Sequence, residues 1–381
     1  MRVIFYISII GLILFEIANV FFIMPLPGSQ EMNSMEIAYF LHISRWYFRL
    51  ILGVLFLSSL FIIKWKYKSI PFFASLTFLV IFYLFNFKMS ADHMFYQPNK
   101  ILMKSSADNK VDSFRLVIGV DYHGKSRAYP IQFIGYHHQL IDTIDGDRIM
   151  VTYCTVCRSG RVYLPMIGQK NEEFRLVGMD HFNALFEDKS TRSWWQQESG
   201  KAIAGPLKGR ELQELFSQQM SLSKWLEHYP QSLIMQPDPN FQIKYDSLSN
   251  YEISGKSKLT KIDSASWNKK SLVVGVKVKN DKKVYDWNLL KKERIIHDFI
   301  DSIPIILILS DDNKSFFAFE RFSSIDTFLI NNDTLINKNL KFNINGTSIK
   351  AIGNEKIKSL VPVQAYQEFW HSWQTFNPKL N

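Results

Sequence analysis

Long apolar runs fill the first quarter of the chain, and shorter apolar runs broken by polar residues follow. The long runs are residues 3–23, 46–63 and 70–87. A helix of about 20 apolar residues crosses the roughly 30 Å hydrocarbon core of a bilayer, so each run predicts a transmembrane helix. Glu16 interrupts the first run, and a carboxylate in lipid is costly enough that we expect it to face another helix or water.

Basic residues flank these runs on one side. Arg2 precedes the first run, and Lys64, Lys66 and Lys68 fill the turn between the second and third. Because cytoplasmic loops are enriched in Lys and Arg, we expect the N-terminus and this turn in the cytoplasm. Three crossings then place everything after residue 88 outside the cytoplasm. An alternative left open is that the first run is a cleaved signal peptide.

The remainder of the chain has the pattern of short strands. Runs rich in β-branched residues and bounded by Gly, Asp or Asn predict strands. These strands are expected at 115–121, 149–153, 161–164, 272–278 and 303–309. Short helices are expected at 212–219, 222–228 and 363–376. The predicted fold class is therefore α+β and mostly β, behind a three-helix transmembrane anchor.

Two segments of the β-rich region resemble each other. Residues 117–120 and 273–276 begin a match that continues without a gap, and Trp225 recurs later as Trp373. Such a repeat predicts a duplicated, two-lobed extracytoplasmic body. The predicted divisions are an anchor (1–88), a linker (89–111), a first lobe (112–240), a connector (241–271) and a second, degenerate lobe (272–381).

The amino-acid composition argues against two classes of function, nucleic-acid binding and nucleotide binding. The net charge is +10, but the lysines are dispersed and form no basic stripe interleaved with aromatic residues. We interpret this charge as a solvated surface and expect no nucleic-acid partner. The glycines of 200–209 lack the spacing of a phosphate-binding loop, so no nucleotide cofactor is expected. The predicted partner is the lipid bilayer.

The only two cysteines, Cys154 and Cys157, form a C-x-x-C motif. Such a pair binds a soft metal, cycles between dithiol and disulfide, or locks a turn. The matching positions of the second lobe hold Ser310 and Asn313, while the apolar framework is retained there. The cysteines are therefore present in one predicted lobe only, and we infer that the fold itself does not require them.

Motifs around the cysteines are shared with a widespread bacterial family. They are Arg-Ala-Tyr-Pro at 127–130, Val-Thr-Tyr-Cys at 151–154, and the block 174–209 with Ser-Trp-Trp-Gln and Gly-Pro-Leu-Lys-Gly. On these motifs the chain resembles the family called domain of unknown function 3179, over most of its length after residue 112. The resemblance implies an extracytoplasmic, membrane-anchored protein, here of the bacterial inner membrane with a periplasmic domain, and it implies no named activity.

The chain departs from the family pattern beside the cysteines. Thr155 stands where Pro is usual, Arg158 where Gly is usual, and His138 where Glu is usual. Proline and glycine favour tight turns, so these changes argue against a tight zinc-knuckle turn.

A metal site requires ligands beyond the two thiolates, since a tetrahedral site takes four. His137 lies one short hairpin before Cys154 and is the expected third ligand, and His181 is the candidate fourth. Cysteine and histidine ligands suit copper or zinc. The residues expected beside the metal without binding it are His138, Arg158, Asp180 and Asp188.

Two alternatives to the metal site stay open at this point. An exposed C-x-x-C outside the cytoplasm is a common tool of disulfide exchange, although no helix is expected to begin at this pair. A disulfide that pins a turn would instead make the protein a membrane-tethered structural or interaction module. The sequence does not decide whether the protein is an enzyme.

Overall fold

The computed structural model describes residues 1–255, 257–338, 340–349 and 359–378. Its internal contacts divide the chain into two compact units, and each unit is built from two stretches of sequence. Unit 1 comprises Met1–Tyr96 and Met166–Leu212, and unit 2 comprises Gln97–Pro165 and Gln213–Asn381.

This division differs from the predicted one because residues 166–212 pack with the N-terminal helices instead of with the rest of 112–240. The predicted second lobe, 272–381, includes residues 339, 350–358 and 379–381, which lie outside the described residues.

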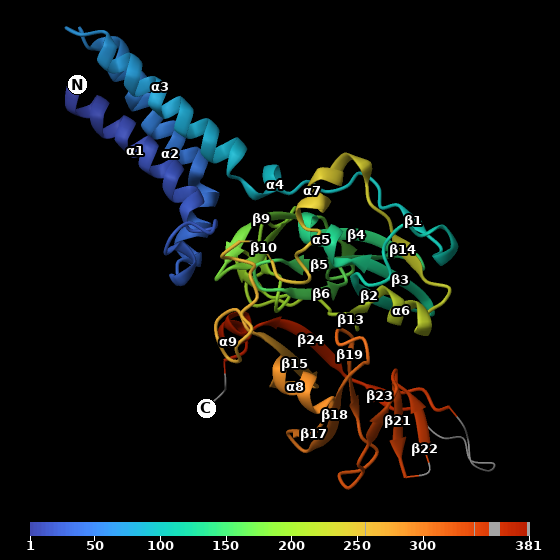
Figure 1. Cartoon of the computed structure of the whole chain (residues 1–381). Coiled ribbons are helices and arrows are strands. Elements are labelled where there is room, and N and C mark those ends of the chain that lie inside the picture. The colour runs from blue at the N-terminus through green and yellow to red at the C-terminus, as the bar shows by residue number, and fades with distance from the viewer. Residues whose placement is uncertain (256, 339, 350–358, 379–381) are drawn as a thin grey trace. The chain divides into compact units, whose positions relative to one another are not determined.

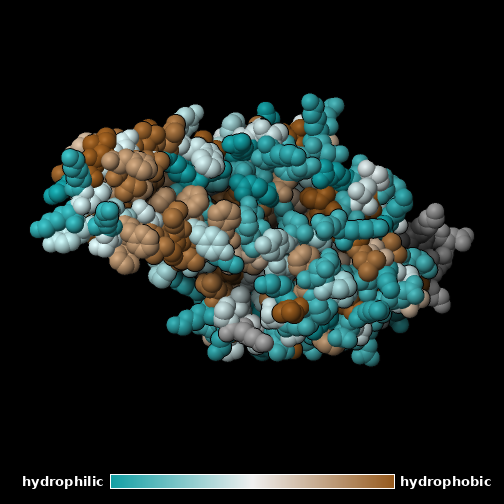
Figure 2. All heavy atoms as spheres, turned by 90° about the horizontal axis from the view of Figure 1, so that it is seen from above, coloured by the Kyte–Doolittle hydropathy of each residue, from teal (hydrophilic) through white to brown (hydrophobic). Residues whose placement is uncertain are grey.

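Three long helices begin unit 1, and Figure 1 shows them running side by side. They are α1 (Arg2–Phe21), α2 (Met35–Ile62) and α3 (Ser69–Tyr83), and a π-helical segment η2 (Leu84–Lys88) continues α3. All three are long and apolar enough to cross a membrane, as predicted. Figure 2 shows apolar side chains gathered on the surface of these helices, where Phe61 is 82% exposed and Trp46 64%.

Glu16 is fully buried among these helices. Arg49 from α2 donates two hydrogen bonds of 2.8 Å to its two carboxylate oxygens, and the Asn86 amide from η2 donates a third at 2.8 Å. A buried carboxylate is tolerable only when its charge and lone pairs are matched in this way. The network ties all three helices together, and the expectation that Glu16 faces another helix is confirmed.

The second stretch of unit 1 forms a sheet of order β12-β11-β10-β9. Its strands are β9 (Phe174–Asp180), β10 (Asn183–Asp188), β11 (Trp194–Gln196) and β12 (Ala202–Ala204), preceded by a small hairpin of β7 (Met166–Ile167) and β8 (Lys170–Asn171). The sheet packs on the helix ends: Met179 N–H donates to the Ile23 carbonyl at 2.7 Å, and Glu187 lies 3.1 Å from His42 of α2. These contacts explain why α2 begins well before the predicted residue 46.

Short elements complete unit 1. They are the 3-10 helix η1 (Ser29–Glu31) between α1 and α2, and the single turn α4 (Ala91–Met94) after η2. Asp92 of α4 accepts a hydrogen bond of 3.0 Å from Arg175 of β9, which joins the end of the helical stretch to the sheet.

Unit 2 begins with a five-stranded sheet of order β1-β14-β3-β2-β13 and a three-stranded sheet of order β4-β5-β6. The strands are β1 (Met103–Lys104), β2 (Leu116–Tyr122), β3 (Lys125–Pro130), β4 (Gln139–Ile144), β5 (Asp147–Cys154), β6 (Ser159–Tyr163), β13 (Gln218–Ser221) and β14 (Leu233–Met235). The helices are η3 (Ser106–Asp108), α5 (Ile131–His137), α6 (Leu222–His228), η4 (Pro239–Phe241) and α7 (Gln242–Ser247).

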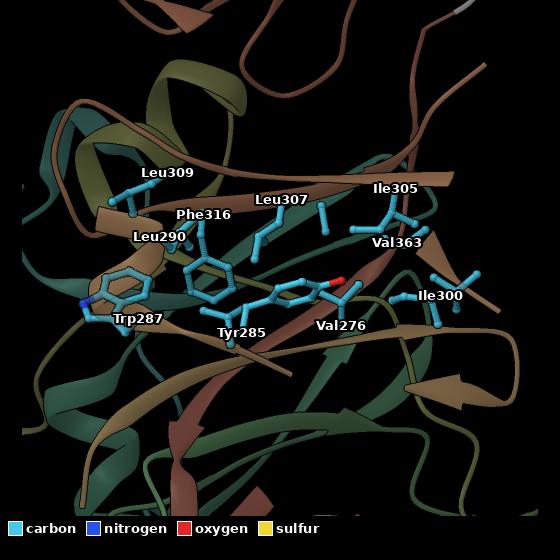
Figure 3. Close-up of a cluster of buried hydrophobic side chains, with 13 residues drawn as sticks. Val276, Tyr285, Trp287, Leu290, Ile300, Ile305, Leu307, Leu309, Phe316 and Val363 are labelled. Carbon is cyan, nitrogen blue, oxygen red and sulfur yellow. The ribbon is translucent and has the colours of Figure 1, made fainter. Parts of the chain in front are cut away.

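The rest of unit 2 holds sheets of order β16-β15-β24, β17-β18-β19-β23 and β20-β21-β22. The strands are β15 (Leu272–Val278), β16 (Asp281–Asp286), β17 (Ile295–Ile300), β18 (Ile303–Leu309), β19 (Phe316–Glu320), β20 (Leu329–Asn331), β21 (Thr334–Asn337), β22 (Leu340–Asn343), β23 (Val361–Pro362) and β24 (Gln364–Phe369). The helices are α8 (Trp287–Glu293) and α9 (Trp370–Phe376). Figure 3 shows the buried core between these sheets, with Tyr285, Leu307 and Phe316 at its centre.

All five predicted strands are present, and β15 and β18 have the predicted bounds. The helix predicted at 222–228 is confirmed as α6. The helix predicted at 212–219 is wrong, because β13 begins at Gln218 and pairs with β2. The helix predicted at 363–376 is half right, since its first part is β24, which pairs with β15.

The same succession of elements occurs twice in unit 2. The order β2, β3, α5, β4, β5, β6 is followed later by β15, β16, α8, β17, β18, β19. A Trp ring lies over a strand glycine in each series: a Cβ on Gly119 would come within 2.2 Å of Trp225, and one on Gly275 within 1.8 Å of Trp373. The glycines are therefore required by the packing of the two rings.

We predict that Gly119→Ala destabilises the protein by about 1–3 kcal/mol, because the added methyl group overlaps the fully buried Trp225 ring. The measurement is denaturation of the full chain in detergent, followed by tryptophan fluorescence. Gly53→Ala is the control, since a Cβ there meets no atom within 4 Å. Equal stability of the two variants would contradict the packing argument.

A second prediction concerns the buried ion pair of the helices. Glu16→Gln leaves the Arg49 charge without its carboxylate and should cost about 3–5 kcal/mol, whereas a Glu16→Gln, Arg49→Gln double variant should recover part of that loss. Thermal unfolding of Glu16→Gln, Arg49→Gln and the double variant in lipid nanodiscs measures the effect. Additive losses in the double variant would show that the two side chains are not coupled.

Candidate functional site

The two cysteines lie on the tight turn that joins β5 to β6. Cys154 is the last residue of β5 and pairs across the sheet with Ser159, the first residue of β6. Gly160 follows, and a Cβ at this position would come within 2.6 Å of the Ile118 side chain. The Ser-Gly that follows the motif therefore allows the turn to pack against β2.

Neither cysteine forms a disulfide, and both thiols are completely buried. Their side chains share a hydrogen bond, and the Ser372 hydroxyl at the start of α9 also contacts Cys157. Burial, together with the hydrogen bond to Cys154, raises the pKa of Cys157 well above its ordinary value. Cys157 is therefore a protonated thiol at neutral pH, and it is poorly suited to attack a disulfide on another protein.

Two cationic side chains lie beside the dithiol. The Lys270 ammonium donates to the Val156 carbonyl at 2.9 Å and lies 4.7 Å from the centre of the Phe369 ring. The Arg158 guanidinium lies 5.5 Å from the same ring. Burial lowers the pKa of Lys270 to about 8, and the fields of Cys154 and Cys157 oppose this shift. The Lys270 charge would therefore offset part of the cost of a negative charge on the sulfurs, although burial still raises the pKa of Cys157.

Tyrosines cover the turn from the other side. Tyr251 donates from its hydroxyl to the Thr155 carbonyl at 2.9 Å, and its own carbonyl accepts a hydrogen bond from Arg158. The Arg158 guanidinium also stacks on the Tyr251 ring at 4.2 Å. The Tyr153 hydroxyl lies 3.3 Å from that of Tyr251, and burial raises the pKa of Tyr153 to about 12.

A buried ion pair connects this turn to β24. Arg161 of β6 lies 3.0 Å from Glu368, and their side chains are 1% and 0% exposed. The Phe369 N–H donates to the Cys157 carbonyl at 2.8 Å, one residue further along β24. The site is therefore assembled from β5, β6, the segment around Tyr251 and Lys270, and the β24–α9 junction.

The predicted ligand His137 lies at the end of α5. It is fully buried, and its Nε2 lies 2.7 Å from the Tyr245 hydroxyl. His138 follows with a left-handed backbone, φ 61°, and its Nδ1 lies 3.0 Å from the Tyr153 carbonyl. Burial lowers the pKa of His138 to about 4, so this ring is neutral at pH 7.

The other predicted residues belong to unit 1, whereas the cysteines belong to unit 2. His181 Nδ1 lies 2.6 Å from Asp180, and this hydrogen bond raises the pKa of His181. Asp188 is fully buried and accepts hydrogen bonds from the Trp195 indole at 2.8 Å and the Ser193 backbone at 3.0 Å. The contacts of Asp180 and Asp188 organise the sheet of unit 1.

No group of three or more His, Cys, Asp or Glu side chains close enough to hold a metal ion occurs among the residues that the structure describes. The ligand roles of His137 and His181 and the identity of the metal stay predictions. The residues that sequence reasoning missed are Lys270, Tyr251, Phe369, Ser372 and the Arg161–Glu368 pair. They lie far from the motif along the chain, and only the fold brings them to it.

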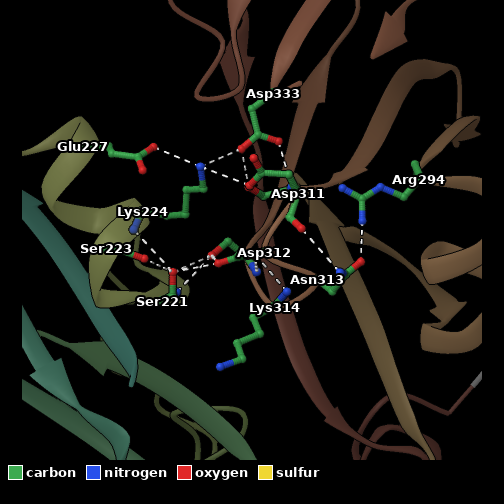
Figure 4. Close-up of polar contacts among 12 residues, drawn as sticks. Ser221, Ser223, Lys224, Glu227, Arg294, Asp311, Asp312, Asn313, Lys314 and Asp333 are labelled. Atoms are coloured by element: carbon green, nitrogen blue, oxygen red, sulfur yellow. Dashed lines mark hydrogen bonds and ion pairs between the residues drawn. The ribbon is translucent and has the colours of Figure 1, made fainter. Parts of the chain in front are cut away.

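The turn between β18 and β19, like the cysteine turn between β5 and β6, lies beside a lysine (Figure 4). Lys224 of α6 lies 2.9 Å from Asp333 and 3.1 Å from Asp311 of this turn. Asp312 accepts a hydrogen bond of 2.7 Å from Ser221. Both turns of unit 2 thus place their side chains against a cation from a distant part of the sequence.

Comparison with known proteins identifies the family. The family model described as a protein of unknown function, DUF3179, matches residues 99–380, so the chain belongs to that family. No curated protein and no solved structure matches the chain. The family's description names no activity, and the function is therefore argued from the site itself.

The lowered pKa of His138 predicts that the stability of the folded protein depends on pH in the acid range. Because burial lowers this pKa from 6.5 to about 4, the unfolded chain binds a proton between these pH values and the folded chain does not. Stability should therefore fall as the pH drops from 6.5 to 4. His138→Asn should reduce that fall by on the order of 1–3 kcal/mol, measured by denaturant unfolding at several pH values.

The matched control is His123→Asn, since His123 is exposed and has a similar left-handed backbone, φ 52°. This variant should leave the slope of stability against pH unchanged. The same slope in both variants would refute the buried, neutral state of His138.

Proposed function

We propose that the protein is a membrane-anchored, soft-metal-binding protein that holds Cu(I) between the thiolates of Cys154 and Cys157. The observation that carries the proposal is the buried, reduced thiol pair with Lys270 and Arg158 beside it. Thiolate ligands select soft ions such as Cu(I) over magnesium or calcium.

The number of donors favours copper over zinc. Zinc in structural sites takes four ligands in a tetrahedron, and a catalytic zinc still takes three from the protein. The described part of the chain gathers only the two thiols at this place. Cu(I) accepts two thiolates in a linear arrangement, so it needs no third side chain.

The balance of charge at the site also supports the proposal of a Cu(I) ion between the two thiolates. A Cu(I) ion between two thiolates carries one net negative charge, and an uncompensated charge in a buried site costs several kcal/mol. The Lys270 ammonium and the Arg158 guanidinium supply positive charge at that place. Metal binding must also displace the thiol protons, so the affinity should rise with pH.

We further propose that the site lies outside the cytoplasm and that unit 2 is a duplicated body. Arg2 and the lysines of the turn between α2 and α3 support the first point through the positive-inside rule. The strand register supports the duplication, because Val117 pairs with Pro130 and Val273 pairs with Asp286, and these residues fall on each other when the two segments are aligned.

The test is Cu(I) binding to the full, reduced chain in detergent, measured in competition with a chromophoric Cu(I) chelator and by X-ray absorption. We expect about one copper per chain with sulfur neighbours only. Cys154→Ser and Cys157→Ser should each lower the affinity at least a hundredfold, because a single thiolate cannot hold the ion between two sulfurs. Lys270→Met should lower it about tenfold through the lost positive charge.

Lys269→Met is the control for Lys270→Met, since Lys269 is the exposed neighbour of the half-buried Lys270. No binding to the wild-type chain would refute the proposal, and a disulfide found in protein purified without reductant would favour the pinned turn. Binding of one zinc ion per chain with nitrogen neighbours would also refute the proposal of a copper ion held by two sulfurs. It would favour a Cys/Cys/His site that includes His137.

A further inference from the structure

A cleft of about 340 Å³ lies in unit 2, and Glu252 and Ile253, which follow Tyr251 in the chain, line it. This volume is at the small end of the range for ligand sites, which is roughly 300–1,000 Å³. The cleft shares no side chain with the dithiol, and the metal proposal gives it no role.

The most informative group in the cleft is the Glu252 carboxylate. Its side chain is only 6% exposed, and its Oε2 accepts a hydrogen bond of 3.1 Å from the Leu116 N–H. Its Oε1 has no hydrogen-bond donor among the described residues, and the nearest cation, Arg115, lies 3.9 Å away. A buried carboxylate oxygen without a donor costs free energy that a ligand donor would recover.

The remaining walls combine apolar surface with charged side chains, which are Lys291, Lys314 and Asp263. Trp287, Leu272 and Ile253 supply apolar surface. Lys291 is exposed, lines the same cleft and makes no ion pair with any residue that the structure describes. The cleft therefore offers an acceptor, an apolar wall and a cation within one small volume.

We propose that this cleft binds a small zwitterion, an α-amino acid with an apolar side chain. Its ammonium group donates to Glu252 Oε1, its side chain packs on Trp287 and Leu272, and its carboxylate faces Lys291. Each of the three lining features then has a partner, and a ligand that lacks one of the two charged groups leaves either Glu252 or Lys291 unmatched.

The test is isothermal titration calorimetry of the full chain in detergent with three matched probes. They are L-leucine, 4-methylpentanoate, which lacks the ammonium group, and 3-methylbutylamine, which lacks the carboxylate. We expect leucine to bind at least tenfold more tightly than either analogue. Glu252→Gln should weaken leucine binding about tenfold or more and abolish its advantage over 4-methylpentanoate.

Lys291→Gln should weaken leucine binding severalfold, whereas Lys292→Gln, at the exposed neighbouring position, should leave it unchanged. Circular dichroism of each variant verifies that the fold is retained. The proposal is overturned if leucine does not bind the wild-type chain at millimolar concentration, or if 4-methylpentanoate binds as well as leucine. Copper loading is measured separately on the same samples, so failure here is distinguishable from failure of the metal proposal.

Discussion

The ion pair of Arg161 with Glu368 is the constraint on which the arrangement of unit 2 depends. Both side chains are almost inaccessible to solvent, at 1% and 0%, and they join β6 to β24 across more than 200 residues of sequence, a separation of 207. Removing either partner would take away the closest counter-charge of the other, since the next carboxylate near Arg161, that of Glu214, lies 4.0 Å away. The pair therefore holds the cysteine turn, at the start of β6, against Phe369 at the end of β24.

The same principle recurs at two other places where the fold buries charge. Glu16 and Arg49 satisfy each other inside the helical bundle of unit 1, and Lys224 is surrounded by carboxylates in unit 2. At the cysteine turn the nearby cations are Lys270 and Arg158, and the groups able to become anionic are the thiols. Burial disfavours negative charge on the Cys157 thiol, and if a metal cation joined two thiolates there, the nearby Lys270 and Arg158 would offset part of the cost of the net negative charge.

Much of the fold follows from periodicity along the chain. The three apolar runs identify α1, α2 and α3, and β-branched runs identify strands such as β15 and β18. Errors occurred where tertiary pairing decided the conformation. Residues 212–219 have helix-compatible spacing, but β13 completes a sheet edge beside β2. Likewise, β24 fills the edge of β15, and only its continuation becomes helix α9. The local sequence pattern cannot show whether the fold offers a neighbouring strand for pairing.

The candidate site was predictable only in its local part. The C-x-x-C motif can be recognised from the sequence alone. The side chains that surround it, Tyr251, Lys270 and Ser372, cannot, because their roles depend on contacts across about a hundred residues or more. The ligand role of His137 rests on its closeness to Cys154 in the sequence and stays a prediction; in the structure its Nε2 lies 2.7 Å from the Tyr245 hydroxyl.

Two turns of unit 2 each lie near a lysine from a distant part of the sequence. At the β18–β19 turn, Asp311 lies 3.1 Å from the Lys224 ammonium, so this turn carries a negative charge beside a cation. At the β5–β6 turn, Cys154 and Cys157 lie near Lys270, but in the sequence match they fall on Ser310 and Asn313, so Asp311 is not the counterpart of either cysteine. A thiol pair becomes anionic by losing protons to a bound metal. Thiolates formed in that way would lie near Lys270 as Asp311 lies near Lys224, which is the physical argument for the proposed metal at the β5–β6 turn.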